Sequence, residues 1–524
     1  MTTASAGAAT ADVVQSVDWL AIAPPVLAAL AALAVLVLDL FLPATRTHLL
    51  GPLAVTGLGA AALALIPLVG EDRATFCLTT DPAACSYVAD PFALVVQLLV
   101  LGGAFLTALL SLPAVQDERL PAGEYWFLLL ASAAGAALLP ASRDLATLVI
   151  ALETASLPAF ALVGLRRGDR RSSQAALTFF LSSVTATAVM LLGISFLYAA
   201  TGSLHLTTVA ERLPAADAPL GTLAAAGAAL TLVGFAFKTA AAPFHFWVPD
   251  AYAGAPLPVA AYLSVIGKVV GFTGLALVTL LALPSYADIW GPLLAVLAAL
   301  TMSIGNLGAL RQRPDRAQSA VRLLAWSSVG QAGYLLVPLA AAAATAGTPG
   351  ARATTDTSAA LGATVSYALM YTVVNLGAFA VVVHVSRNGR PTDTRLDDHR
   401  GLAARNPVAA LALGFQLLCL AGLPPGVIGL FAKVVVFRAA LQADLGWLAV
   451  IMAVNVVVAL YYYLNWTALL FRRPATDRAP AAAATARQPL GIPLTAAVAL
   501  TAAAALLLSG APQAALRYTS GTLL

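Results

Sequence analysis

Charged residues are scarce in this chain of 524 residues. Asp, Glu, Lys and Arg together make up 10% of the sequence, whereas hydrophobic residues make up 60%. A typical globular protein is about 25% charged and about 45–50% apolar. A compact soluble fold would have too few charges to solvate its surface. The composition therefore excludes a soluble protein and indicates a polytopic membrane protein.

Cysteine is also rare, and this scarcity excludes several kinds of site. Cys77, Cys85 and Cys419 are too few for a disulfide scaffold, an iron–sulfur cluster or a structural zinc site. Cys77 and Cys85 fall in one loop, where they form either a local disulfide or two unpaired thiols. The sequence contains no Walker motif, flavin signature or metal cluster. We therefore expect no metal, no bound cofactor and no redox centre in this chain.

The apolar residues are grouped into runs of the length that a bilayer requires. Residues 1–19 carry no lysine or arginine, so they do not form a cleavable signal peptide. Runs of roughly 20 apolar residues predict membrane-spanning helices. The predicted spans are 20–41, 49–69, 91–112, 124–140, 145–165, 173–200, 221–242, 256–283, 290–310, 319–343, 358–385, 407–439, 446–470 and 489–509. The expected fold is therefore all-α, with fourteen transmembrane helices.

Arginine predicts the orientation of these helices. The Arg-rich loops all lie on one side of the predicted bundle, and the opposite loops carry only Arg73, Arg143, Arg212 and Arg352. The residues of the Arg-rich side are Arg166, Arg167, Arg170, Arg171, Arg311, Arg313, Arg316, Arg387, Arg390, Arg395, Arg400, Arg405, Arg472, Arg473 and Arg478. The positive-inside rule makes this side cytoplasmic and places both termini outside. Topology thus accounts for the net charge of +4, and no nucleic-acid partner is expected.

The three lysines of the chain, unlike its arginines, all lie inside apolar segments. They are Lys238, Lys268 and Lys433, and Glu153 is the one glutamate well inside a predicted helix. Each such group costs about 2.5–3.5 kcal/mol at the centre of a bilayer. A lysine can snorkel to the interface, and a buried ion pair can simply fix the packing. Lysine nevertheless suits a proton carrier because, unlike arginine, it can lose its proton inside a protein.

Prolines interrupt several of the helices that carry these charges. Pro158 follows Glu153, Pro243 follows Lys238, and Pro424 with Pro425 precedes Lys433. Proline lacks an N–H group and so leaves a carbonyl four residues earlier without a partner. Interrupted helices in two halves of a transporter indicate a polar site near the middle of the membrane.

Two histidines are possible proton relays. His245 could pass protons between Lys238 and Lys268, although a purely structural interfacial role is equally compatible with the sequence. His384 ends a predicted helix near the cytoplasmic side and is a second possible relay.

Several motifs together resemble the antiporter-like membrane subunits of bacterial NADH:quinone oxidoreductase (respiratory complex I), most closely subunit N. The resemblance covers about residues 90–470. The matching segments are SRDL at 142–145, LETASLP at 152–158, GLRRGDRRSS at 164–173, FAFK at 235–238, PFH at 243–245, PD at 249–250, GAP at 254–256, RLLAWSS at 322–328, NLGAF at 375–379 and GLPP at 422–425. Departures from the family's pattern are Ala253, Thr178 and Gln331, which occupy positions where many members carry ionisable side chains.

The resemblance implies a domain organisation and a role for each charged residue. Helices 1–3 would occupy 1–123, two inverted five-helix repeats would occupy 124–283 and 290–470, and a linker with helix 14 would occupy 471–524. Glu153 would modulate Lys238, Lys268 would bridge to the centre, and Lys433 would exchange protons with the external side. Flavin, iron–sulfur clusters and quinone would belong to partner subunits. The partners would be the other membrane and peripheral subunits of complex I, especially neighbouring antiporter-like subunits, in the bacterial cell membrane.

The sequence leaves three functions open. The first is proton translocation within a redox-driven complex, the second is a subunit of a multisubunit Na⁺/H⁺ antiporter, and the third is a structural anchor for partner subunits. Sodium dependence would separate the first two. Ion transport that survives Glu153→Gln or Lys238→Ala would favour the third.

Overall fold

A computed structural model gives the fold and describes residues 17–79, 81, 84–215, 217–346, 351–387, 394–473 and 491–513. Within these residues, thirteen helical stretches are long and apolar enough to cross a membrane. They are formed by α1 (Ala23–Phe41), η1 (Ala44–Leu49) with α2 (Leu50–Leu63) and η2 (Ile66–Leu68), α3 (Pro91–Asp117), α4 (Ala122–Leu138) with η3 (Leu139–Ala141), α5 (Leu145–Val163), α6 (Arg170–Thr201), α8 (Ala218–Lys238), α10 (Leu257–Leu277) with the π-helical η5 (Val278–Ala282), η6 (Pro284–Tyr286) with α11 (Ala287–Leu310), α12 (Ser319–Ala342), α13 (Ala351–Arg387), α17 (Gly446–Phe471) and α19 (Ile492–Gly510).

The remaining predicted span, 407–439, is divided into two shorter helices. These are α15 (Pro407–Ala421) and α16 (Val427–Gln442), and Gly422 has a φ of +82° between them. With this broken helix the predicted set of fourteen spans is complete, so the predicted fold class is confirmed. The other short elements are α7 (Leu206–Arg212), η4 (Leu213–Ala215), α9 (Val248–Gly254), η7 (Leu396–His399), α14 (Leu402–Arg405), β1 (Arg73–Cys77) and β2 (Cys85–Ala89).

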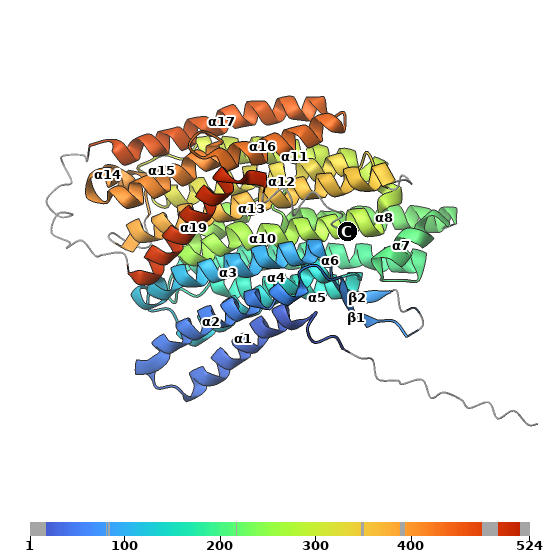
Figure 1. The fold of residues 1–524 in the computed structure, drawn as a ribbon, viewed down its shortest axis with the longest axis horizontal. Coiled ribbons are helices and arrows are strands. Elements are labelled where there is room, and N and C mark those ends of the chain that lie inside the picture. The colour runs from blue at the N-terminus through green and yellow to red at the C-terminus, as the bar shows by residue number, and fades with distance from the viewer. Residues whose placement is uncertain are drawn as a thin grey trace, which may run out of the picture.

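The helices run side by side along the long axis of the molecule (Figure 1). The core lies at α10, α12 and α13, where 83%, 94% and 89% of the most apolar stretch is buried. The corresponding values for α1 and α19 are 28% and 22%, so these two helices present most of their apolar surface outward. The helix α19 crosses back over the bundle and packs against α13 and α3.

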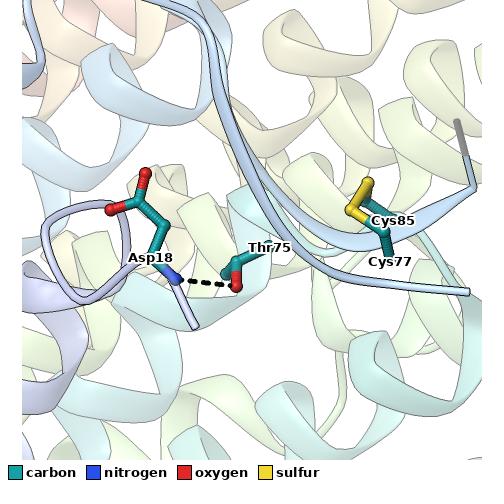
Figure 2. The surroundings of a disulfide bond; sticks show 4 residues. All are labelled: Asp18, Thr75, Cys77 and Cys85. Carbon is teal, nitrogen blue, oxygen red and sulfur yellow. Dashed lines mark hydrogen bonds between the residues drawn. A yellow bond between two sulfur atoms is a disulfide. The ribbon is translucent and has the colours of Figure 1, made fainter. Parts of the chain in front are cut away.

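A two-stranded hairpin lies at one end of the bundle. In it β1 and β2 pair antiparallel, with Cys77 opposite Cys85, and these two cysteines form a disulfide (Figure 2). The sequence left this pairing open, and the structure resolves it. The backbone N–H of Asp18 donates to Thr75 Oγ1 at 3.1 Å, and Arg73 pairs with the Asp18 carboxylate at 3.0 Å. The hairpin thus holds the segment that leads into α1.

Ion pairs join the elements at both ends of the bundle. At the hairpin end, Arg143 pairs with Asp90, which also caps the N-terminus of α3. Burial raises the pKa of Asp90, and the nearby Arg143 opposes that effect. At the opposite end, where α14 lies, Arg166 forms a two-pronged pair with Glu118 at 2.7 and 3.1 Å. One arginine of the predicted Arg-poor loops, Arg143, and one of the Arg-rich loops, Arg166, therefore form ion pairs between helices.

Candidate functional site

Lys238 lies in a polar cluster between α5, α6 and α8. Its Nζ donates to Glu153 Oε1 at 3.1 Å, and to Ser156 Oγ and Ser183 Oγ at 2.9 Å each. The hydroxyl of Thr187 also donates to Glu153 Oε1, at 2.7 Å. The Lys238 side chain is 7% exposed and the Glu153 side chain is 21% exposed. The structure therefore brings the predicted Glu–Lys pair together and supplies hydroxyl partners for both charges.

Helix geometry explains why Lys238 reaches this cluster. It is the last residue of α8, and the chain leaves the helix through Ala240, which has a φ of +62°, and a cis bond before Pro243. The helix α10 passes very close to this point, since a Cβ on Gly271 would lie 2.7 Å from the carbonyl carbon of Lys238. On the same face of α10, Lys268 lies one turn earlier.

A small cavity extends from Lys238 towards α10. Its volume is about 40 Å³, which is room for roughly three water molecules. The polar residues in its wall are Ser132, Ser156, Lys238 and Tyr262. The hydroxyl of Tyr262 donates to Ser132 Oγ at 2.9 Å, and Ser132 Oγ donates to the carbonyl of Ala155 at 2.6 Å, so these two hydroxyls link α10 to α5 along the wall.

Lys268 has different surroundings from those of Lys238. It is 2% exposed, and its Nζ donates to the hydroxyl of Tyr252 on α9 at 3.2 Å. Ser328 of α12 donates to the same hydroxyl at 3.4 Å. Tyr252 therefore links the lysine of α10 to the second half of the chain. Among the described residues, Lys268 makes no ion pair with a carboxylate.

Lys433 is bound by the break between α15 and α16. Its Nζ donates to the carbonyls of Leu420 at 2.9 Å and Ala421 at 2.7 Å. In a continuous helix these carbonyls would accept from residues 424 and 425, but both are proline and have no N–H. The ammonium thus satisfies carbonyls that the prolines leave free, at the negative end of a helix dipole. The break that the sequence predicted at Pro424 and Pro425 therefore provides the hydrogen-bond acceptors of Lys433.

The two candidate histidines lie apart from these contacts. The ring of His245 lies beside that of Trp326 of α12, tilted by 55° with centroids 5.5 Å apart, and its Nδ1 is buried without a hydrogen bond. His384 is in the last turn of α13 and its Nε2 lies 3.2 Å from Asn406 Nδ2. Neither geometry tests the predicted relay roles. The helix break predicted at Pro158 is wrong, because α5 continues through this residue and loses only the one backbone hydrogen bond that proline cannot donate.

The sequence did not single out the hydroxyl groups of the site. Ser156 and Ser183 accept from Lys238, and Tyr252 accepts from Lys268. Thr187 donates to Glu153, and Ser328 donates to Tyr252. Across the part of the chain that the structure describes, no group of three or more His, Cys, Asp or Glu side chains could hold a metal ion.

Comparison with known proteins identifies the family. Residues 142–459 match the family described as NADH:quinone oxidoreductase/Mrp antiporter, TM. NADH-quinone oxidoreductase subunit N 2 of Streptomyces griseus is 68% identical over 520 residues, which are 98% of this chain and 95% of that protein. The chain belongs to this family. Subunit N of Salinispora tropica is 48% identical over 89% of this chain and 87% of its own length.

Solved structures agree with this family assignment. A chain of respiratory complex I from Thermus thermophilus is 31% identical, with a TM-score of 0.73 over 95% of this chain and all of that one. A chain of the Mrp complex from Dietzia has a TM-score of 0.79 at 22% identity and covers 96% of this chain and 97% of its own, a likeness that shows the fold alone. The predicted resemblance to an antiporter-like subunit, and among these to subunit N, is confirmed.

Proposed function

We propose that this chain is the proton-translocating membrane subunit N of an NADH:quinone oxidoreductase, and that Glu153, Lys238, Lys268 and Lys433 carry the protons. The observation that carries the proposal is the contact of 3.1 Å between the buried Lys238 and the half-buried Glu153, in a protein whose curated relatives are subunits N of this enzyme. Electron transfer takes place in other subunits, which hold the flavin, the iron–sulfur clusters and the quinone.

The three lysines have partners suited to successive steps. The Glu153 carboxylate stabilises the ammonium of Lys238, and movement of that carboxylate removes the counter-charge and favours loss of the proton. The cavity beside Lys238 extends towards α10, the helix that carries Lys268, and the Tyr252 hydroxyl accepts a hydrogen bond from Lys268. Lys433, bound by two carbonyls, is the last carrier before the external side. Each charge moved against 100 mV costs about 2.3 kcal/mol, so quinone reduction must drive the movement.

The two repeats are part of the same proposal. A helix that carries a lysine is interrupted once in 124–283, between α8 and α9, and once in 290–470, between α15 and α16. This correspondence supports two repeats that each provide one half of the proton path.

The orientation is supported by two unrelated features. The Arg-rich loops belong to the α14 end, which the positive-inside rule makes cytoplasmic. The Cys77–Cys85 disulfide lies at the opposite end, and disulfides persist in oxidising compartments outside the cytoplasm. Both features support an orientation in which the hairpin faces the outside of the bacterial cell and α14 faces the cytoplasm.

The first experiment tests the assembly. The tagged chain is purified in mild detergent from its own membranes, and flavin and iron–sulfur absorbance are read together with NADH:quinone activity. Recovery of these cofactors and of the activity with the chain supports the proposal. Recovery with hydrophobic subunits alone, and with sodium-dependent proton exchange, would contradict it and support the antiporter.

A second experiment tests the residues. In inverted vesicles that contain the assembled complex, we expect Glu153→Gln to lower NADH-driven proton uptake by at least about tenfold, the scale of a lost proton-transfer group. Glu124→Gln is the control because Glu124 forms only an exposed pair with Arg167 at 3.5 Å. For Lys433→Ala the control is Arg438→Gln, an exposed residue of the same helix. Normal proton uptake in Glu153→Gln would instead favour a structural anchor.

A further inference from the structure

A second, larger cavity lies far along the chain from the lysines, at the α14 end of the bundle. Its volume is about 370 Å³, and it opens between η1, the first turn of α2, the last turns of α3 and the start of α4. Its walls are formed by Ala44, Thr47, His48, Gly51, Leu112, Val115, Gln116, Arg119, Leu120, Ala122 and Trp126. None of these residues belongs to the proposed proton path.

The wall of this cavity is amphipathic. Leu112, Val115, Leu120 and Trp126 provide an apolar side, and the Trp126 ring is 2% exposed. The polar side is provided by Thr47, His48, Gln116 and Arg119. Ligand pockets typically have volumes of about 300–1,000 Å³ and combine a mainly apolar wall with a few polar groups. The size and the lining therefore suit an amphipathic ligand.

Arg119 has no carboxylate partner within the described part of the chain, and its neighbours explain why. The preceding residue, Glu118, is paired with Arg166 at 2.7 Å. The residue before that, Asp117, is paired with Arg387 at 2.6 Å. The carboxylate of Asp39 lies against Gly123 in the first turn of α4 and is not part of the cavity wall. Arg119 is thus a free guanidinium at the edge of a cavity.

A histidine on the opposite wall adds a second nitrogen donor. His48 is exposed on η1, and its Nδ1 lies 3.1 Å from the carbonyl of Thr45. Because Nδ1–H donates to that carbonyl, Nε2 is the nitrogen left for a ligand, and it donates to a phosphate when the imidazole is protonated. Exposed apolar side chains lie just before η1, at Leu40 (77% exposed) and Phe41 (80% exposed), where hydrocarbon chains would cover them. The cavity is therefore placed where phospholipid headgroups meet the protein.

We propose that this cavity binds the phosphate of an anionic phospholipid, with Arg119 and His48 as its ligands and the apolar wall against the glycerol and upper acyl chains. Basic pockets between transmembrane helices on the cytoplasmic side suit such headgroups. A guanidinium binds phosphate through charge-assisted, often two-pronged hydrogen bonds. Free phosphate offers the same ligand chemistry, but it would leave the apolar wall uncovered.

The test uses the full-length chain purified in detergent. It is equilibrated with mixed micelles that contain phosphatidylglycerol or phosphatidylcholine, and the bound lipid is counted by native mass spectrometry. We expect phosphatidylglycerol to be retained about tenfold more strongly than phosphatidylcholine. Arg119→Gln should lower the affinity for phosphatidylglycerol by about tenfold, the scale of one lost charge-assisted contact.

Two further variants and a competition experiment make the test specific. Arg313→Gln removes an exposed arginine of the same end that does not line the cavity, and it should retain the lipid fully. Gln116→Trp fills the cavity mouth but keeps Arg119, and it should release the lipid. Equal retention of the two lipids, or equal affinity in Arg119→Gln and Arg313→Gln, would overturn the proposal. Displacement of the lipid by millimolar inorganic phosphate would show a site for free phosphate and would overturn the lipid assignment.

Discussion

Lys238 shows how far a single residue can be understood from sequence. The lysine and Glu153 stood out because charges are rare in apolar runs, and the structure places them in contact at 3.1 Å. The hydroxyls around them could not be predicted, because a serine or threonine within a helix usually bonds to a carbonyl of its own helix. Ser182, Thr185 and Ser195 of α6 do so. Only the packing of α6 against α8 distinguishes Ser183 from them.

Replacing Ser183 tests whether the hydroxyl cluster positions the lysine. Ser183→Ala removes a fully buried acceptor of Lys238, a loss of about 1 kcal/mol or more. We expect the ratio of proton uptake to NADH oxidation in inverted vesicles to fall about fivefold, with the complex still assembled. Ser182→Ala is the matched control, since that hydroxyl donates only to carbonyls of its own helix. Equal ratios in the two variants would show that Ser183 does not position Lys238.

Gly422 makes the second interruption possible. Its φ is +82°, a backbone conformation that costs other residues about 1–2 kcal/mol. A Cβ there would also lie 3.3 Å from Lys433 Nζ. Gly422→Ala should therefore lower the thermal midpoint of the purified chain, whereas Gly446→Ala should not, because nothing lies within 4 Å of a Cβ at Gly446. An unchanged midpoint in Gly422→Ala would mean that the break tolerates a side chain.

At the scale of elements, sequence predicted the long helices and missed the short ones. A run of about 20 apolar residues is decisive because lipid offers no hydrogen bonds to an unpaired backbone. The hairpin of β1 and β2 and the helix α7 lie in connections where that constraint is absent, and the short helix α9 follows the interruption at Pro243. Pro424 and Pro425 marked the break in 407–439, but the capture of the Leu420 and Ala421 carbonyls by Lys433 depends on tertiary packing.

The connection between α13 and α15 contains a buried histidine that makes its stability depend on pH. His399 is 1% exposed, and burial lowers its pKa to about 4, from an ordinary value of 6.5. The unfolded chain therefore binds a proton at His399 between pH 6.5 and 4, whereas the folded chain does not. The contribution of the neutral His399 to the free energy of unfolding is fully present above pH 6.5. It is lost as the pH falls towards 4, by up to about 3 kcal/mol.

A comparison of two chains isolates the contribution of His399. Thermal midpoints of the wild type and of His399→Gln are measured from pH 7.5 to pH 4.5, and we expect the wild-type midpoint to fall more steeply below pH 6.5. His205→Gln is the control because His205 is only half-buried and belongs to neither proposed site. Parallel curves for the wild type and His399→Gln would show that His399 does not control this dependence.

At the scale of the whole molecule, the orientation is the feature that a chemical experiment can settle. The positive-inside rule and the disulfide support the same orientation for different reasons, one through charge and the other through redox compartment. Cys419 is fully buried in α15, whereas reduction of the hairpin frees the thiols of the half-buried Cys77 and of Cys85, which is 7% exposed. Labelling of these two positions therefore reports on one face of the membrane.

The labelling experiment uses an impermeant phosphine reductant followed by a polyethylene-glycol maleimide. We expect two labels per chain in right-side-out vesicles and none in inverted vesicles until detergent is added, because the hairpin faces outward. The double variant Cys77→Ser, Cys85→Ser should remain unlabelled in both preparations, which assigns the labels to the hairpin. Labels that appear only in inverted vesicles would show the opposite orientation. Lys433 could then no longer be assigned to the external side by topology.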